Sequence, residues 1–562
     1  MTSFLFKILF AILLFSIIPF CDAIAGESDD SVAYECSLRF AATDGFPMII
    51  RGTGIRTDLV AIRQFYASRF FKPIWIKDGH TLQKVQELLD GIRHAEADGL
   101  HLKDYSRVPQ DLQNALMPLQ EKEDTVSAAN LADLDIILTD KYVSFGYDLL
   151  YGRVNMNHYC GSKCLIGRQE GLLEKLEKVQ DEAQFPELLQ SFHHSDSAYE
   201  NLKEALARYR HIASQGGWPV LSGEGILKIG SQGERVLILR KRLWLSGDLS
   251  VENPELDVDL YDNILAGAVR GFQKRHNLES TGTINMKTRM ALNQPIEEDI
   301  RRIELNLERW RWFPRDLGDL YIMVNMPDYS LKVVQDEETV MTMKTVIGKP
   351  FWHTPSFNGR MTYLEINPVW KIPPSILEEE TIPNIRKNHD YIKKKNLKFF
   401  RGQGKTFHEI SPDKINWARA HPRTFPYQVI QGAGPANPLG RLKFMFPNAY
   451  DVYFHDTPTK HLFKKEKRTF SHGCIRIEKP IDLAAFLMER DRQWTRSQLM
   501  ARINRKKTEQ ILFKEPVNVY ISYFTTWVDD EGVLQVRPDI YGSDHTLEVG
   551  LREWEDAGMM TP

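Results

Sequence analysis

SHGCIR, residues 471–476, is the stretch that decides the fold and chemistry of this chain, and YFHDTP at 453–458 is its partner upstream. A free thiol has a pKa near about 8.5, so a nucleophilic cysteine at neutral pH needs a neighbouring imidazole or another positive group. His455 lies 19 positions before Cys474 and takes this role if the two strands are adjacent, with an ion pair as the expected reactive form. Gly473 permits a tight turn, and the amides of Gly473 and Cys474 are then placed to face a developing oxyanion.

Four neighbours of this pair are candidates for supporting roles. The second nitrogen of the imidazole must be oriented, and the backbone carbonyl of Asp456 is the candidate. Tyr453 shares a strand face with the base by period-two alternation, so it positions the base or lends a hydroxyl to the oxyanion. Ser471 and His472 are candidates for substrate binding. For His472, a structural hydrogen bond and a direct proton role are the alternatives.

The flanking sequence predicts a mainly β domain. Segments rich in β-branched and aromatic residues lie at 321–324, 331–334, 345–347, 363–366, 452–454, 475–477 and 517–523. Helices are expected at 480–490, with Pro480 in the first turn, and near 497–504. Between about 376 and 428 the alternation fades and a basic run appears, which predicts an inserted cap. We expect the catalytic domain over 318–510, and a C-terminal strand and tail over 511–562.

The sequence before residue 310 has helical periodicity. Apolar residues recur at helical spacing between about 58 and 210, until GGWP at 216–219 breaks the pattern. Short amphipathic helices follow, and then a polar helix near 297–310. These patterns predict a helical domain over 50–215 and a small helical domain over 225–295. The expected fold class is therefore multidomain α+β.

The N-terminus predicts export. Lys7, an apolar run over 8–20 and an A-x-A pattern at 23–25 are typical of a signal peptide over residues 1–25 that is cleaved after Ala25. An uncleaved inner-membrane anchor is the alternative, although the run is short for a membrane span. The predicted location is the periplasm, where disulfides form.

Four cysteines follow the predicted cleavage site. Cys160 and Cys164 are candidates for a local disulfide, and the pairing of Cys36 is open. Taken without its neighbours, Cys474 has two alternatives to a reactive thiol, a disulfide with Cys36 or an inert buried side chain.

Length and charge bound the remaining possibilities. With 562 residues and 42% apolar content, the chain has room for roughly three or four domains. Its 72 basic and 75 acidic residues give a net charge of −3, which excludes a global field that would attract nucleic acid or an anionic membrane.

The site and its flanks resemble the L,D-transpeptidase catalytic domain, in the long periplasmic branch that has a scaffold domain, a wall-binding domain and a capped catalytic domain. The resemblance covers most of the mature chain and is carried by RWRWFPRDLG (309–318), VNMP (324–327), NPVWKIPP (367–374), LGRLKFMFPN (439–448) and the tail at 516–542. Segments 230–242, 269–277 and 282–292 resemble a small helical peptidoglycan-binding domain, with a helical spacer that lacks wall affinity as the alternative.

The resemblance implies a two-step acyl transfer. Cys474 would attack the carbonyl that joins diaminopimelate to the terminal D-Ala of a tetrapeptide stem, and an amine of a second stem would resolve the thioester to a 3-3 cross-link. Arg476 would bind a stem carboxylate, or else pair with a local acid, and Trp370 would wall the acyl site, or else be a core residue. The implied partners are stem peptides, glycan strands and other cell-wall synthesis enzymes. No nucleic acid, cofactor or metal is expected.

Three alternatives to this activity stay open at this point. Water may replace the second stem as acceptor, which makes the protein an L,D-carboxypeptidase. A catalytically silent wall-binding scaffold is a second possibility, against which the intact Cys474, Gly473 and His455 argue. A zinc site made of His455, His472 and Cys474 lacks a fourth ligand and the usual close spacing.

Overall fold

A computed structural model describes residues 29–42, 49–50, 53–54, 59–78, 80–102, 105, 126–154, 177–179, 184–249, 258–402, 406, 408–421 and 424–559. The predicted export segment and the candidate disulfide between Cys160 and Cys164 lie outside the described residues. Within these ranges, no helix has the length and apolar character that a membrane crossing needs.

The N-terminal unit is a helical bundle built around one long central helix, α5 (Ala128–Tyr151), which is buried along most of its length. The other elements are α2 (Asp29–Ala41), β1 (Ile49–Ile50), β2 (Thr53–Gly54), α3 (Leu59–Ser68), β3 (Ile76–Lys77), β4 (His80–Thr81), α4 (Gln83–Arg93), the 3₁₀ turn η1 (Ala95–Asp98) and α8 (Phe185–Gln190). The buried residues of α5 include charged ones such as Asp135 and Lys141, and its apolar residues form one core with those of the neighbouring helices.

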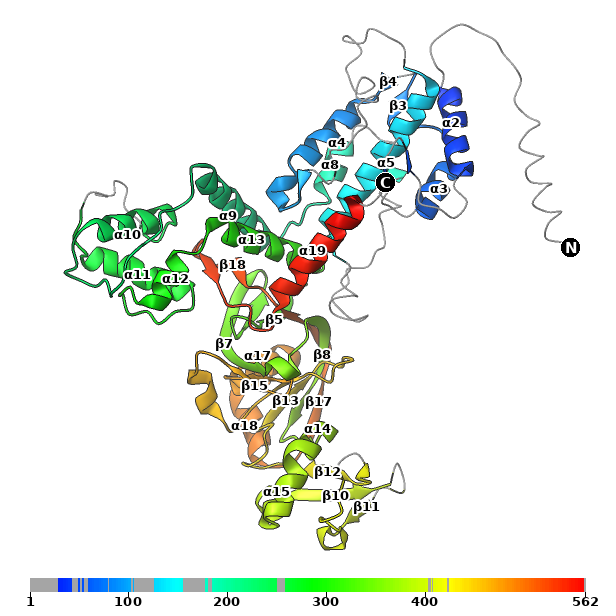
Figure 1. Cartoon of the computed structure of the whole chain (residues 1–562). Coiled ribbons are helices and arrows are strands. Elements are labelled where there is room, and N and C mark those ends of the chain that lie inside the picture. The colour runs from blue at the N-terminus through cyan, green and yellow to red at the C-terminus, as the bar shows by residue number, and fades with distance from the viewer. Residues whose placement is uncertain are drawn as a thin grey trace, which may run out of the picture.

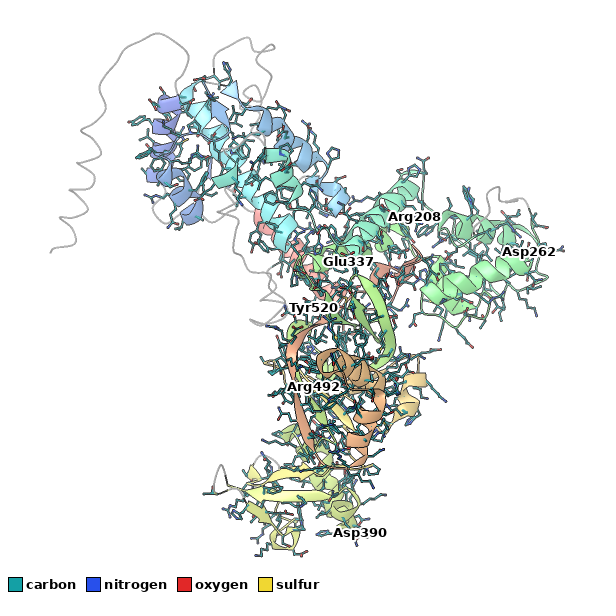
Figure 2. The ribbon with its side chains drawn as sticks, turned by 180° about the vertical axis from the view of Figure 1, so that it is seen from behind. Arg208, Asp262, Glu337, Asp390, Arg492 and Tyr520 are labelled. Atoms are coloured by element: carbon teal, nitrogen blue, oxygen red, sulfur yellow. The ribbon has the colours of Figure 1, made fainter. Side chains whose placement is uncertain are left out.

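A second, smaller helical unit has its own core. It consists of α10 (Glu234–Leu245), α11 (Asn263–Arg275) and α12 (Met286–Leu292), which bury Val236, Leu243 and Phe272 against one another. Asp262, labelled in Figure 2, caps α11 by accepting a hydrogen bond from the amide of Leu265 at 2.7 Å. Helix α9 (Ser197–Ser214) precedes this unit in the sequence and α13 (Ile296–Trp310) follows it. These two helices pack against each other.

The β domain is a nine-stranded sheet that curls back on itself. Its order is β15-β7-β16-β14-β13-β8-β17-β5-β6, and β6 also pairs with β7, which closes it into a barrel-like shape. The strands are β5 (Leu320–Asn325), β6 (Ser330–Gln335), β7 (Glu338–Gly348), β8 (Phe357–Ile366), β13 (Leu442–Met445), β14 (Phe454–His455), β15 (Thr469–Ser471), β16 (Ile475–Ile477) and β17 (Glu509–Ser522). Helices α17 (Pro480–Arg492) and α18 (Arg496–Asn504) pack against its core, and Pro480 stands in the first turn of α17.

A cap is inserted between β8 and β13 and lies at the far end of the molecule from the helical units (Figure 1). It contains β9 (Trp370–Lys371), α14 (Pro374–Ile376), a π-helical turn (Leu377–Thr381), α15 (Ile382–Lys387), α16 (Asp390–Lys394), β10 (Leu397–Arg401), β11 (His408–Ile410) and β12 (Gln428–Gln431). The strands pair in the order β11-β10-β12-β9. The sequence pattern did not predict this sheet.

The chain returns to the helical units at its C-terminal end. After the hairpin β18 (Thr526–Val528) and β19 (Leu534–Val536), α19 (Ser543–Met559) runs beside α13 (Figure 1). The expected multidomain α+β fold, with helical units beside a mainly β domain, is confirmed.

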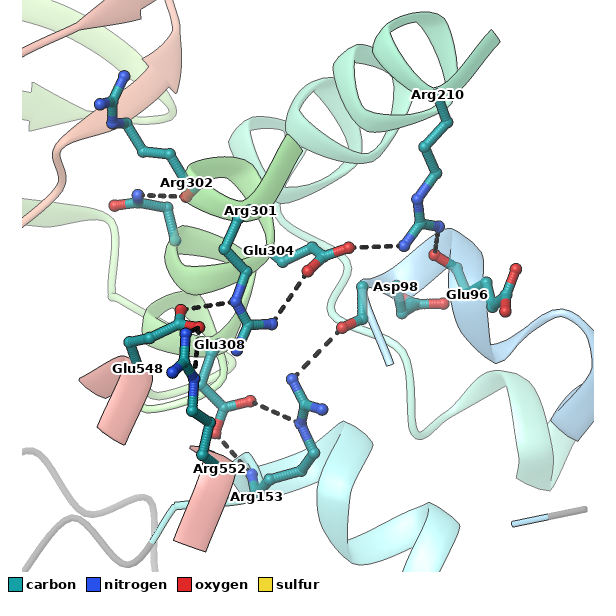
Figure 3. Close-up of polar contacts among 12 residues, drawn as sticks. Glu96, Asp98, Arg153, Arg210, Arg301, Arg302, Glu304, Glu308, Glu548 and Arg552 are labelled. Carbon is teal, nitrogen blue, oxygen red and sulfur yellow. Dashed lines mark hydrogen bonds and ion pairs between the residues drawn. The ribbon is translucent and has the colours of Figure 1, made fainter. Parts of the chain in front are cut away.

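Five polar residues of α13 are buried, although the sequence suggested only a polar helix: Asp299, Glu304, Asn306, Glu308 and Arg309. Glu308 has no exposed side-chain surface. Its Oε1 accepts hydrogen bonds from the backbone amides of Arg153 at 2.6 Å and Val154 at 3.1 Å, and its Oε2 pairs with Arg311 at 2.8 Å. Two turns earlier, Arg301 bridges Glu304 and Glu548 of α19 (Figure 3). These contacts join the N-terminal bundle, α13 and α19.

We predict that Glu308→Gln lowers the midpoint of thermal unfolding by several degrees. The amide keeps the volume but removes the charge that compensates Arg311, and breaking a buried pair costs about 3–5 kcal/mol. Calorimetry of the full chain measures the effect. The matched control is Asp482→Asn, which removes an exposed pair with Arg496 and should change the midpoint little. Equal midpoints for both variants would show that the junction does not stabilise the fold.

Candidate active site

Two adjacent strands bring the predicted site residues onto one face of the sheet. Strands β14 and β16 pair in parallel, with His455 opposite Arg476, and the amide of Ile475 donates to the carbonyl of Tyr453 at 3.1 Å. Side chains two apart on a strand share a face. Tyr453, His455, Cys474 and Arg476 therefore lie on the same side, while Ile475 is fully buried in the core on the other.

Hydrogen bonds from Ser471 and Thr354 hold the turn that precedes Cys474. Ser471 Oγ donates to the carbonyl of Cys474 at 2.6 Å and accepts from the amide of Gly473 at 3.2 Å. Thr354 Oγ1 donates to the carbonyl of Gly473 at 2.7 Å. The φ of Gly473 is 114°, which disfavours any residue with a Cβ. Because the Gly473 amide is already bonded, the Cys474 amide is the member of the expected pair that is left for an oxyanion.

The imidazole of His455 is buried and oriented. Its Nδ1 lies 2.5 Å from the carbonyl oxygen of Asp456, which requires a proton on Nδ1 and leaves Nε2 as the acceptor. Burial, followed by the charge of Arg476, lowers the pKa of His455 to about 3. The Asp456 carboxylate instead accepts from the amides of Arg441 and Thr457, so Asp456 orients the base through its backbone.

The thiol of Cys474 is free and half-buried. Its Sγ lies 3.7 Å from the carbonyl oxygen of Asp451. Burial raises the pKa of the thiol, while hydrogen bonds from Tyr453 and the charge of Lys443 oppose that rise. Burial thus raises the pKa of the thiol and lowers that of the imidazole, and both shifts disfavour the ion pair expected from the sequence.

Lys443 is a site residue that the sequence analysis did not single out. It lies on β13 opposite His455, with Glu365 of β8 on its other side. Its Nζ is 4.1 Å from the centroid of the Tyr453 ring. Burial lowers the pKa of Lys443, and the charges of Glu365 and Cys474 counter that effect. The string LGRLKFMFPN contained a signal for this position. Leu442 and Phe444 are core residues, so Lys443 between them lies on the opposite face of the strand.

The remaining predicted residues lie at the edges of the site. Arg476 donates to the hydroxyl of Thr459 at 3.2 Å, so this hydrogen bond is not made to a carboxylate. Trp370 pairs with Gln431 in the cap sheet and also packs against the cap core. His472 lies 4.5 Å from Trp352, ring to ring, and its Nε2 is 3.5 Å from Glu380 on the π-helical turn of the cap.

A cleft of about 1070 Å³ opens at Cys474. The residues discussed above that line it include Cys474, Gly473, His472, Tyr453, Lys443 and Trp370. Ser471 and His455 are buried behind this wall. Across the described ranges, no cluster of three or more His, Cys, Asp or Glu side chains is arranged to hold a metal ion.

We predict that alkylation of Cys474 by iodoacetamide accelerates with pH, with a midpoint above that of a free thiol, because burial raises the pKa of this group. Lys443→Met should move the midpoint higher still, since it removes a positive charge that favours the thiolate. Lys465→Met, in an exposed loop, is the matched control and should leave the profile unchanged. If Lys443→Met has the same midpoint as the wild type, Lys443 has no electrostatic effect on the thiol.

Comparisons with known proteins agree with this geometry. Residues 319–501 match the family model of the L,D-transpeptidase catalytic domain, residues 60–206 that of a scaffold domain, and residues 232–292 that of a "putative peptidoglycan binding domain". A protein of Haemophilus influenzae described as a "putative L,D-transpeptidase" is 29% identical over 255 residues, which are 45% of this chain and 50% of that protein. The chain therefore spans about half the length of this curated relative.

Solved structures of lower similarity include two L,D-transpeptidases. The one from Mycobacterium smegmatis is 13% identical over 36% of this chain and 58% of that chain, with a TM-score of 0.18. The one from Stackebrandtia nassauensis is 12% identical over 54% of this chain and 96% of that chain, with a TM-score of 0.20. Successive parts of the chain thus match a scaffold domain, a "putative peptidoglycan binding domain" and, at 319–501, an L,D-transpeptidase catalytic domain.

Proposed function

We propose that this protein forms 3-3 cross-links in peptidoglycan through a thioester on Cys474. The observation that carries the proposal is the juxtaposition of Cys474 and Tyr453 at a cleft, with the oriented, neutral imidazole of His455 on the same face of the next strand. A thiol nucleophile, a base with a free nitrogen and a hydroxyl donor are the parts that acyl transfer needs.

In the first step, Cys474 Sγ attacks the carbonyl carbon of the amide between diaminopimelate and D-Ala. The thiol proton passes to Nε2 of His455 as the sulfur–carbon bond forms. The same proton then moves to the departing amine as the carbon–nitrogen bond breaks, so that D-Ala leaves as a neutral amine and the stem remains as a thioester. The Asp456 carbonyl keeps the imidazole in the tautomer that this transfer requires.

Negative charge on the carbonyl oxygen has three partners on the active face. The hydroxyl of Tyr453 and the amide of Cys474 donate hydrogen bonds, and the ammonium of Lys443 contributes its charge next to the phenol ring. Arg476 lies two residues after the nucleophile on the same face and binds a stem carboxylate. Trp370 walls the acyl chain from the cap side.

In the second step, an amine of another stem attacks the thioester carbonyl. His455 accepts the proton of the amine and returns it to the sulfur, which restores the thiol and leaves an amide cross-link. Stem peptides and glycan strands are thus the partners, with other cell-wall synthesis enzymes as further ones. We infer a periplasmic location from this chemistry and from the export segment predicted at residues 1–25.

The test is to incubate the full chain with disaccharide tetrapeptide and to resolve the products by mass. We expect a cross-linked dimer and free D-Ala. Cys474→Ala should abolish both products, and Tyr453→Phe should slow acylation by about 100- to 1000-fold, the usual effect of removing one oxyanion donor. Loss of D-Ala without dimer would instead identify a carboxypeptidase. No reaction, and no adduct on Cys474, would indicate a silent wall-binding scaffold.

A further inference from the structure

The active-site cleft continues beyond the catalytic domain. On the far side of Cys474 from the cap it is lined by residues of α13 and of the C-terminal segment that leads into α19, among them Arg309, Tyr541 and Thr546. These residues lie outside the range 319–501 that matches the catalytic-domain model. We call this part of the cleft the α19 arm.

A row of rings connects the α19 arm to the nucleophile. The Tyr523 and Tyr541 rings are stacked at 5.8 Å, and Tyr541 lies 5.9 Å from His353. The ring of Trp352, the residue that precedes His353 in the chain, lies 4.5 Å from the ring of His472. His472 is two residues before Cys474. The hydroxyl of Tyr541 donates to the carbonyl of Gly348 at 2.6 Å, which fixes the C-terminal segment to β7.

A buried cation, Arg309, lies at the Tyr523 end of the row, the end farthest along it from Cys474. Arg309 is 3% exposed, and its guanidinium carbon lies 5.3 Å from the centroid of the Tyr523 ring. Its Nη1 donates to Asp544 at 2.5 Å, whereas Nη2 is buried and has no hydrogen-bond partner among the described residues. A buried guanidinium nitrogen without an acceptor is costly, and a ligand carboxylate or carbonyl oxygen would satisfy it.

The two sides of Cys474 differ in chemistry. In the sheet, β16 lies between β14 and β7. The β14 side carries Tyr453, His455 and Lys443, which hold the oxyanion and take the proton, so the donor carbonyl belongs there. The β7 side carries the aromatic row and Arg309, together with hydroxyl side chains such as Ser356 and Ser543. The cleft volume of about 1070 Å³ is at the top of the range for one drug-sized ligand, as expected of a cleft that receives two chains.

We propose that the α19 arm binds the acceptor, a second stem peptide, with a carboxylate or carbonyl oxygen of that peptide at Arg309 and its amine directed at the thioester on Cys474. This inference rests on the proposed function. The aromatic row covers the peptide and excludes water from the thioester, which favours aminolysis over hydrolysis. Acceptor selection is thereby assigned to residues that flank the catalytic domain.

The test separates the first step from the second. Thr546 is exposed on α19 and lines the arm, so Thr546→Trp should fill the arm without disturbing the fold. His545→Trp is the matched control, on the same helix and exposed, but not part of the cleft lining. The full chain is incubated with disaccharide tetrapeptide. Intact-protein mass follows the acyl-enzyme, and product mass gives the ratio of dimer to hydrolysed stem.

We expect Thr546→Trp to acylate Cys474 at the wild-type rate but to lower the ratio of dimer to hydrolysed stem by about 10- to 100-fold. Arg309→Lys, checked for an unchanged unfolding midpoint, should raise the acceptor concentration needed for half-maximal dimer formation. His545→Trp should behave as wild type. If Thr546→Trp slows acylation as much as dimer formation, the arm holds the donor and the inference is wrong. An unchanged ratio also overturns it. A wild-type protein that is not acylated refutes the proposed function itself, and the inference falls with it.

Discussion

The active face depends on the parallel register of β14 and β16. This pairing sets Phe454 opposite Ile475 and His455 opposite Arg476. Because side chains alternate along a strand, a slip of one residue would turn one whole set of polar groups into the core. Phe454 and Ile475 oppose such a slip, since both are completely buried. The core therefore fixes, on the opposite face, which polar groups stand beside Cys474.

Helix α13 connects the cleft to the neighbouring helical units through adjacent side chains that point in different directions. Successive residues of a helix point about 100° apart, so adjacent positions serve different neighbours. Glu308 is bonded to the N-terminal bundle, while Arg309 is bonded to Asp544 of α19 and lines the cleft. The position of the helical bundle and the shape of the α19 arm are thus set by one rigid helix.

The sequence predicted the features that depend on short stretches of neighbouring residues. Period-two alternation located the core strands, and the expected adjacency of the strands that carry His455 and Cys474 is found in the pairing of β14 with β16. Lys443 was missed because one lysine in an alternating strand looks like a solvated side chain, and alternation does not reveal what covers the outer face. The burial of Glu308 was missed for a related reason: its partners, the amides after α5, lie more than 150 residues away. The strands of the cap are short and half-polar, so no periodicity marked them.

Burial disfavours charge on both Cys474 and His455, so in the proposed reaction charge develops only once substrate is bound. A thiol beside a neutral imidazole carries no charge, so burying the pair costs little. An ion pair at the same depth would need stabilisation in every resting molecule. In the proposed reaction, negative charge passes through the sulfur to the carbonyl oxygen only after the substrate has entered. Tyr453 and Lys443 lie on the face where that charge develops. Their contribution is then made chiefly in the transition state, which is where it accelerates the reaction.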